Sequence, residues 1–242
     1  MNMKINDLTI QTAFFTPGLI FSDKLNLSAQ LIKESGSVFD GDPIMLPIPP
    51  DAPPEFPRMI LKSKDEKYIL EIKSLRIDFI IKSDLKDKSQ KNYPATLIKD
   101  YQNKLQSLSS SIISVFKTKI VRLGFIINIQ FKVGDAVEII KKSYISDSKF
   151  TKDAYDLNIG FLNKIALNGT DTNIWFRANA LRSPEKDKDN KIILVMFDTN
   201  TVPEKVLDLT AQNITDFTKT TLEYLDKNLK SYLPEYDEHI NT

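Results

Sequence analysis

The most regular hydrophobic pattern in the chain begins at Tyr93. Beyond Pro94, apolar side chains recur at steps of three and four residues: Leu97, Tyr101, Leu105, Leu108, Ile112, Val115 and Phe116. This spacing predicts a helix of roughly twenty residues with one apolar side. Proline suits the first turn of a helix and is excluded from its interior, so Tyr93-Pro94 marks the start.

The period changes to two residues after Lys119, which predicts a long strand that reaches Lys132. One side of this strand is wholly apolar: Val121, Leu123, Phe125, Ile127, Ile129 and Phe131. The other side is half apolar and carries Arg122 and Asn128. Such a strand belongs in the interior of a sheet, with the helix packed against it. Because buried polar groups need partners, Arg122 and Asn128 are candidates for lining a pocket or bridging to a second half of the molecule.

Shorter patterns predict the remaining elements. Strands are expected at 5–15, 59–61, 68–73, 75–82, 157–167, 173–181 and 192–197, and helices at 25–39, 134–144 and 209–233. The three strands between 59 and 82 form an antiparallel meander, and Asn168-Gly169 is a strong hairpin signal. The apolar run 192–197 predicts a fully buried strand.

Three segments lack a helix or strand pattern. Residues 83–92 and 183–191 are polar and are expected to be loops. Residues 43–57 contain seven prolines, too many for a helix or a paired strand. We expect an extended connector packed on the body of the protein, with a peptide ligand for an aromatic groove as the alternative.

These elements predict an α+β protein with antiparallel sheet and two long amphipathic helices. The order of elements suggests two topologically similar halves, 1–132 and 133–242, within one compact unit. The first half would contain the first strand, the meander, one long helix and the central strand. The second would contain the short helix, the hairpin, the buried strand and the other long helix.

Composition narrows the location and the chemistry. The 242 residues include no cysteine, so the chain has no disulfide framework, thiolate metal site or cysteine nucleophile. Neither a signal peptide nor an apolar run of membrane-spanning length occurs, so we expect a cytoplasmic protein without a membrane partner.

The net charge of +1 conceals an uneven distribution along the chain. The net charge is −3 for residues 1–60, +8 for residues 61–142 and −4 for residues 143–242. A basic middle segment can attract nucleic acid or an acidic partner. Most of the basic residues are lysines scattered among acidic ones, which favours an ordinary solvated surface.

Few residues suggest catalysis. The single histidine, His239, lies close to the C-terminus, and neither a dinucleotide-binding glycine pattern nor a phosphate-binding loop is found. Asp51, Glu71 and Lys73 match the skeleton of the magnesium-dependent nucleases, PD-(D/E)xK, in which two acids hold the ion and lysine steadies water. Glu71 and Lys73 equally fit the solvent side of a meander strand. We expect no metal and no cofactor.

A further candidate surface lies on the predicted strand 173–181. Trp175 and Arg177 share one of its sides, and both residue types are enriched at binding surfaces. The competing interpretation is the amphipathic edge of a sheet.

Two regions resemble a sporadically distributed bacterial family of uncharacterised proteins. Its proline-rich lead, Pro-Arg strand and Ser-x-Asp-Gly-x-Tyr turn correspond here to Pro57-Arg58, Ser63-Lys64-Asp65 and Tyr68, with Arg76 on the next strand. The family's Arg-hydrophobic-Gly strand ending in Asn corresponds to the run from Arg122 to Asn128.

This chain departs from the family pattern at two places. Lys67 stands for the turn glycine, and Ile126-Ile127 replace an Arg-Tyr pair. The resemblance implies the order of elements and brings no reaction with it. A patchy distribution suggests genes associated with defence or mobile elements.

Three hypotheses for function follow. The leading one is a non-enzymatic protein-binding module, as the antitoxin, immunity or accessory member of a bacterial two-gene system. The second is a protein that binds a small ligand or nucleotide through Arg58, Arg76 or Arg122. The third is the magnesium-dependent nuclease. A homo-oligomer is left open, and nucleic acid is a less favoured partner.

Overall fold

The computed structural model describes residues 3–49, 51–83, 88, 93–145, 151, 153–154, 156–181, 192–234 and 236. In chain order its elements are β1 (Lys4–Phe15), α1 (Lys24–Glu34), β2 (Ile44–Met45), β3 (Met59–Lys62), β4 (Tyr68–Ile72), β5 (Arg76–Lys82), α3 (Ala95–Phe116), β6 (Arg122–Lys132), α4 (Ala136–Tyr144), β7 (Asn158–Leu167), β8 (Thr170–Leu181), β9 (Ile192–Thr201) and α5 (Ala211–Tyr232). The predicted α+β class with an antiparallel sheet is confirmed.

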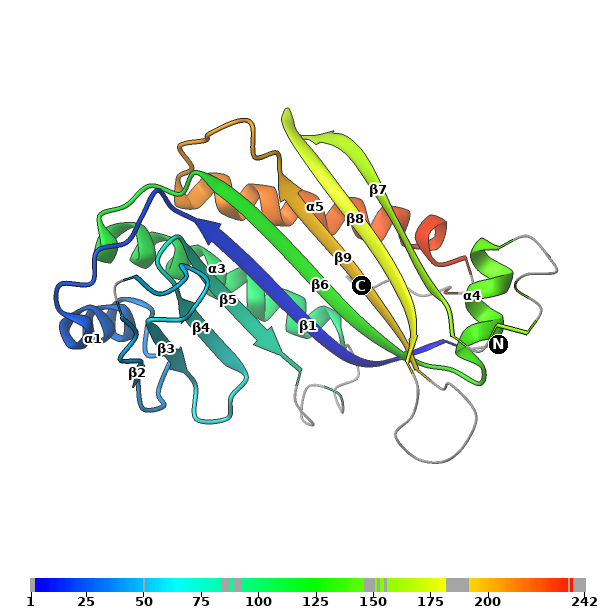
Figure 1. Cartoon of the computed structure of the whole chain (residues 1–242), viewed down its shortest axis with the longest axis horizontal. Helices are drawn as coiled ribbons and strands as arrows, with labels where there is room; N and C mark the ends of the chain where they lie inside the picture. Colours follow the sequence, from blue (N-terminus) through cyan, green and yellow to red (C-terminus); the bar gives the residue numbers. More distant parts are fainter. Residues whose placement is uncertain are drawn as a thin grey trace.

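All nine strands belong to one sheet in the order β2-β3-β4-β5-β1-β6-β9-β8-β7 (Figure 1). Every pair in it is antiparallel. β1 and β6 lie in the middle, so the long strand β6 has a neighbour on each side and lies in the interior of the sheet, as predicted. The helices α3 and α5 lie side by side behind the sheet in Figure 1, and the other face of the sheet is turned to the viewer. No described helix is both long and apolar enough to cross a membrane.

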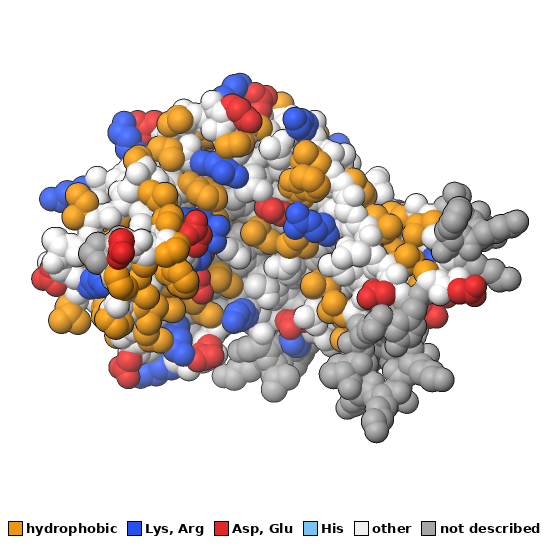
Figure 2. Space-filling model, in the orientation of Figure 1, with side chains coloured by type: hydrophobic (Ala, Val, Ile, Leu, Met, Phe, Trp, Pro, Cys, Tyr) orange, Lys and Arg blue, Asp and Glu red, His pale blue; other side chains and the backbone are white. Residues whose placement is uncertain are grey.

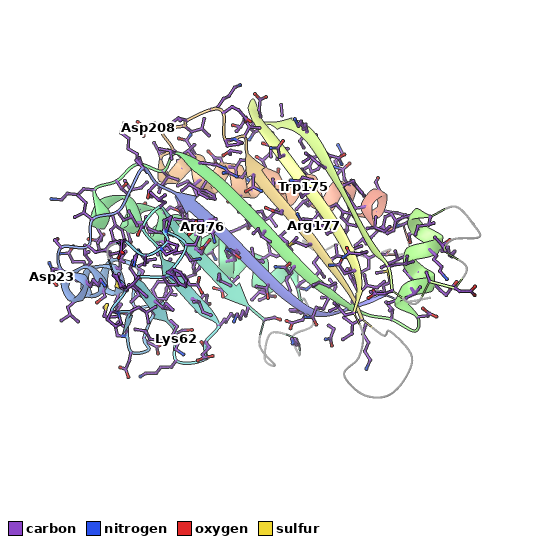
Figure 3. The ribbon with its side chains drawn as sticks, in the orientation of Figure 1. Asp23, Lys62, Arg76, Trp175, Arg177 and Asp208 are labelled. Carbon is purple, nitrogen blue, oxygen red and sulfur yellow. The ribbon has the colours of Figure 1, made fainter. Side chains whose placement is uncertain are left out.

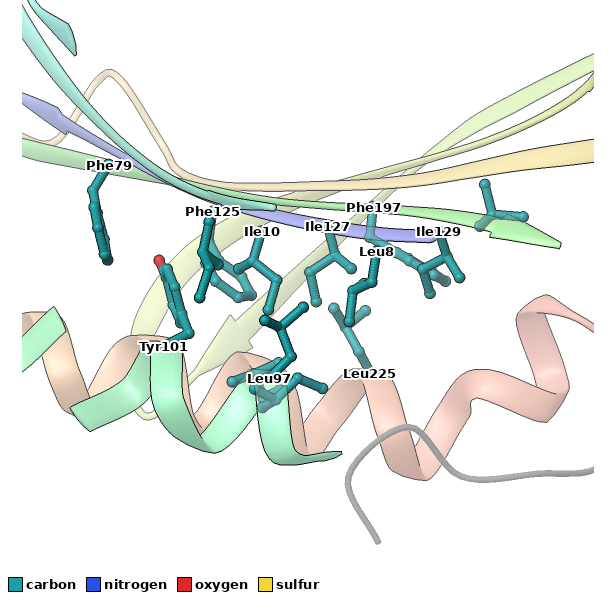
Figure 4. Packing of buried hydrophobic residues seen from close by; sticks show 14 of the residues in the cluster. Leu8, Ile10, Phe79, Leu97, Tyr101, Phe125, Ile127, Ile129, Phe197 and Leu225 are labelled. Carbon is teal, nitrogen blue, oxygen red and sulfur yellow. The ribbon is translucent and has the colours of Figure 1, made fainter. Parts of the chain in front are cut away.

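The core forms between the helices and the sheet. Leu97 and Tyr101 of α3 and Leu225 of α5 point at the apolar side of the central strands (Figure 4). The Tyr101 ring stacks on Phe79 at 5.5 Å between centroids, and its hydroxyl forms a hydrogen bond with Thr12. Because Tyr101 is fully buried, desolvation raises the pKa of its hydroxyl.

The hairpin signal at Asn168-Gly169 is confirmed. Both residues have positive φ angles, 47° and 76°, and they connect β7 to β8 directly. This is the conformation that a two-residue hairpin turn with the twist of its strands requires. The return strand begins at Thr170, three residues earlier than the hydrophobic pattern predicted.

Three of the predicted elements need correction. Helix α1 ends at Glu34, because the chain turns at Gly36 with a φ of 68°. Within the proline-rich segment, Ile44–Met45 pairs with β3, although no paired strand was expected there. β9 is not fully buried: one of its sides faces the core and the other is only half-buried.

The glycine-like position of the β3–β4 turn is Glu66. Its φ is 57°, a conformation that favours glycine. The turn glycine of the motif that this region resembles therefore corresponds to Glu66, and its assignment to Lys67 in the sequence analysis was wrong. Most of the predicted loop 83–92, all of the loop 183–191 and His239 lie outside the described residues.

Candidate functional site

The face of the sheet opposite α3 and α5 carries the residues predicted to bind; we call it the open face. In Figure 2, which views this face, hydrophobic side chains gather over the β2–β3 end, while charged and hydrophobic side chains are more scattered over the middle. Strand pairing determines which side chains meet here, because directly opposite residues share a face.

One row of the open face is basic and runs across β5, β1 and β6. Phe15 pairs with Arg76 on one side and with Arg122 on the other. The guanidinium carbons lie 5.8 Å (Arg76) and 4.5 Å (Arg122) from the Phe15 ring centroid. Both distances are within the range of cation–π attraction. We call these three residues the arginine row.

Asp78 neutralises one end of the arginine row. Its Oδ2 accepts hydrogen bonds from Arg76 Nε at 2.9 Å and from Lys73 Nζ at 2.5 Å, and its Oδ1 accepts one from Gln11 Nε2 at 2.8 Å. Asp78 is fully buried beneath these donors. Lys73 also pairs with Glu71 at 3.0 Å. Arg76 and Lys73 therefore serve an internal network.

Arg58 lies next to this network and has a structural role. Its side chain is buried, with Nη1 and Nη2 donating to the carbonyl oxygens of Pro49 and Ala52, both at 3.0 Å. Its Nε donates to Ser74 Oγ at 3.2 Å. Arg58 thus fastens the proline-rich segment to the sheet, which agrees with the expected packed connector.

Arg122 differs from the other two predicted arginines. No carboxylate of the described residues lies within ion-pair distance of it. Its Nε is buried and has no hydrogen-bond partner among the described residues. Stacking on Phe15 holds the guanidinium in place, so Arg122 is an ordered cation whose two Nη groups form no hydrogen bond with the described residues.

A second basic group lies on β8. The Arg177 guanidinium is 5.5 Å from the Trp175 ring, and Trp175 is 37% exposed. Figure 3 shows both residues on β8, and Arg76 beside the C-terminal end of β1, all on the open face. Arg177 pairs across the sheet with Met196, which pairs with Asn128. The predicted Asn128 therefore lies near Arg177 and not near Arg122.

The two groups are separate parts of one surface. Strand pairing across β9 aligns Trp175 with Ile126 of β6. Ile126 is four residues along β6 from Arg122, and Trp175 lies on β8, two strands away from β6. These offsets correspond to about 13 Å along the strand and about 10 Å across the sheet. The six predicted residues do not converge on one pocket.

Gly124 keeps the surface between the groups flat. An added Cβ would lie 2.7 Å from Asn200 Oδ1 and 3.4 Å from Ala13 Cβ. Asn200 is itself held by a hydrogen bond from its Nδ2 to Asp198 Oδ1 at 2.5 Å. The absent side chain lets Asn200 lie across β6.

Exposed apolar side chains border the arginine row. Leu75, which precedes Arg76, is 45% exposed, and Phe56 and Ile20 are 52% and 82% exposed. The backbone N–H groups of Thr16 and Leu19 donate to Leu75 and Ser74, which brings the segment before Ile20 to this place. The combination of apolar and basic groups is typical of a protein-binding surface.

The nuclease residues do not assemble as predicted. Asp51 lies in an exposed turn, and the carboxylate beside Glu71 and Lys73 is Asp78. Within the described ranges, no three His, Cys, Asp or Glu side chains are placed to hold a metal ion.

Two surface hollows lie elsewhere. One of about 400 Å³ is lined by Lys119 and Asp208 near the start of α5, and one of about 500 Å³ by Lys164 and Lys205 near the β7–β8 turn. None of the six predicted residues lines either hollow.

Sequence reasoning missed Phe15 and Asp78. Phe15 ends an ordinary strand pattern, and its role depends on its two neighbours in the sheet. Asp78 interrupts the apolar run Ile77–Ile81, and a charge in such a run is a signal for a buried network.

A comparison with models of known protein families finds no match, and none of the curated proteins compared is similar in sequence to this chain.

Proposed function

We propose that this protein is a non-enzymatic protein-binding module whose contact surface is the open face, and that its partner presents acidic side chains. The observation that carries the proposal is a pair of arginines, each placed on an aromatic ring. Arg122 lies on Phe15 and Arg177 on Trp175, and neither has a carboxylate of the described residues within 4 Å.

Stacked arginines suit protein recognition for two reasons. Arg and Trp are over-represented among the residues that contribute most to interfaces. Stacking on a ring also orders the guanidinium before binding. Less side-chain entropy is therefore lost when a carboxylate of the partner forms bidentate hydrogen bonds with the arginine.

The spacing of the two groups favours a macromolecular partner. Their separation exceeds the span of a typical small metabolite but fits within a standard protein interface, which buries about 800 Å² on each side. The exposed Leu75 and Phe56 would extend this interface beyond the arginine row.

The proposal includes an internal duplication whose two halves join between α3 and β6, so that β6 opens the second half and does not close the first. Three features support it: β1 and β6 are central neighbours, each is followed by an antiparallel three-stranded unit, and each unit is followed by a helix of 22 residues with one buried side. In this interpretation β3-β4-β5-α3 and β7-β8-β9-α5 are equivalent, and the basic groups come from both halves.

The resemblance to the sporadic bacterial family supplies the proposed setting. The protein would act in the cytoplasm as the antitoxin, immunity or accessory component of a two-gene or defence system. The absence of cysteine supports this compartment.

Co-purification with matched variants tests the proposal. Tagged wild type, R122A, R177A and K219A are expressed in the source cells, with nuclease treatment to remove nucleic acid. Lys219 lies on α5, is 66% exposed and has the same charge, so K219A controls for the loss of a cation. Thermal unfolding confirms that each variant is folded.

We expect one stoichiometric partner with wild type and K219A, and strongly reduced recovery with R122A and R177A. Recovery should also fall as salt rises, because the contacts are between charges. Equal recovery with all four proteins, or no stoichiometric partner, contradicts the proposal.

A second candidate function is the binding of a small anionic ligand or nucleotide at the arginine row. It is favoured by the buried, unpartnered Nε of Arg122. Titration calorimetry with inorganic phosphate and with nucleotides tests it. Heat of binding that disappears in R122A supports this candidate, and its absence in the wild type rules these ligands out.

A further inference from the structure

The two edges of the sheet are protected to different degrees. β2 forms one edge with only two residues and lies between Pro43 and Pro47. Short strands and prolines discourage further pairing. β7 forms the other edge with ten residues, Asn158–Leu167, which include no proline and only one charge, Lys164.

The free backbone groups of β7 can be identified from its pairing with β8. Leu157 accepts a hydrogen bond from the N–H of Ala180, its opposite residue in the register. Hydrogen-bonded pairs alternate along an antiparallel ladder, so residues of odd number in β7 bond to β8. The N–H and C=O groups of Asn158, Gly160, Leu162, Lys164 and Ala166 therefore point outward, where no described strand pairs with them.

Side chains at this edge are also incompletely covered. Ile159, Phe161 and Ile165 point to the helix side and pack on the core, yet each is only half-buried. Their neighbours on β8, Ile174 and Phe176, are fully buried. A further strand beside β7 would complete the apolar layer.

We propose that β7 pairs antiparallel with β7 of a second copy of this chain, about a two-fold axis at Asn163. This register places Phe161 opposite Ile165 and Ile159 opposite Leu167, so apolar residues meet on the helix side. On the open face Gly160 meets Ala166 and Leu162 meets Lys164.

The register also joins the correct backbone groups. The outward-pointing residues of each copy become the hydrogen-bonded pairs, and Asn163 meets Asn163 in a close pair between them. The single cation of the strand faces Leu162 and not its own copy. Because the axis is perpendicular to the sheet, the helices of both copies remain on one side, and the open faces join into one surface.

Charge variants at Leu162 test this register. In L162K, an ammonium group is placed opposite Lys164 twice in each dimer, and in L162E a carboxylate is placed there. Leu162 points to the open face and is only partly buried, so both variants should fold. Molar mass is measured by light scattering after size exclusion, from low to high micromolar concentration.

We expect wild type to have twice the chain mass of 27.6 kDa and L162K to have the mass of one chain. Like charges at two positions should raise the dimer dissociation constant at least about tenfold. L162E should remain dimeric. A monomeric wild type, a dimer that survives L162K, or equal disruption by L162K and L162E overturns the proposal. A monomer whose β7 takes a strand from another protein is among the outcomes that overturn it.

Discussion

Asp78 is fully buried although it lies on the open face, which none of the described helices covers. Three neighbouring side chains, Gln11, Lys73 and Arg76, cover it and donate to both of its oxygens. A buried carboxylate with several donors has its hydrogen-bonding capacity filled. If the carboxylate or its cationic partner is removed, the other charge stays buried without a partner. At the scale of single residues, this network distinguishes Lys73 and Arg76, which neutralise Asp78, from Arg122, which has no carboxylate of the described residues beside it.

The first prediction concerns this network. D78A leaves the nearly buried Lys73 without its closest carboxylate and should lower the free energy of unfolding by about 3 kcal/mol. Q11A removes one neutral donor and should cost about 1 kcal/mol. Urea unfolding followed by circular dichroism measures both. A D78A variant as stable as Q11A would show that the network contributes little.

Asp65 provides a prediction for pH. The Ser63 hydroxyl donates to its carboxylate at 2.5 Å, and this bond, more than any other contact, lowers the pKa of Asp65 below 3.8. A depressed carboxyl pKa stabilises the fold at pH values above the unfolded pKa, and the contribution disappears as pH falls through the folded value. Wild type should therefore exceed D65N in stability at pH 7.

The difference in stability between wild type and D65N should become smaller as pH falls below about 4. Thermal unfolding across this range measures it. In an S63A background the gap should be small at every pH, because the main cause of the shift is absent. A gap that stays constant with pH contradicts the assignment.

At the scale of elements, the β3–β4 turn has an ordinary side chain at a position where the backbone conformation favours glycine. Glu66 adopts a left-handed conformation, which costs an ordinary side chain more than it costs glycine. Its carboxylate is exposed and pairs with Lys62, and such pairs contribute little.

E66G should therefore raise the midpoint of thermal unfolding, by about 2 °C, since relief of the backbone outweighs the surface ion pair. E66A loses the same ion pair but keeps a Cβ in the strained conformation, so its midpoint should not rise. If E66A and E66G behave alike, backbone conformation at this position does not limit stability.

Most elements could be predicted from the sequence because, in a helix or strand with one buried side, apolar residues recur at a regular spacing. The long helix after Pro94, the central strand and the hairpin at Asn168-Gly169 belong to this class. The errors have local causes. In β9, an apolar run gave no sign that Leu194 and Met196 face away from the helices. In β2, the surrounding prolines argued against a strand, although Ile44 and Met45 have backbone groups that can pair with β3.

At the scale of the whole molecule, the open face depends on pairing between segments far apart in the chain. Phe15, Arg76 and Arg122 come from three strands, and only the register of the sheet aligns them. Residue types alone suggested Arg58, Arg76 and Arg122 as equivalent candidates. Their partners distinguish them: carbonyl groups for Arg58, Asp78 for Arg76, and a ring alone for Arg122.

The most direct test of the open face is the dissociation constant of the purified partner with wild type, R122A, R177A and K219A. We predict that each arginine substitution raises this constant at least about tenfold, because each stacked guanidinium contributes about 1.4 kcal/mol or more. K219A, on the opposite side of the molecule, should leave it within about twofold of wild type. Equal constants for all four proteins would show that the partner binds elsewhere and would contradict the proposed function of the open face.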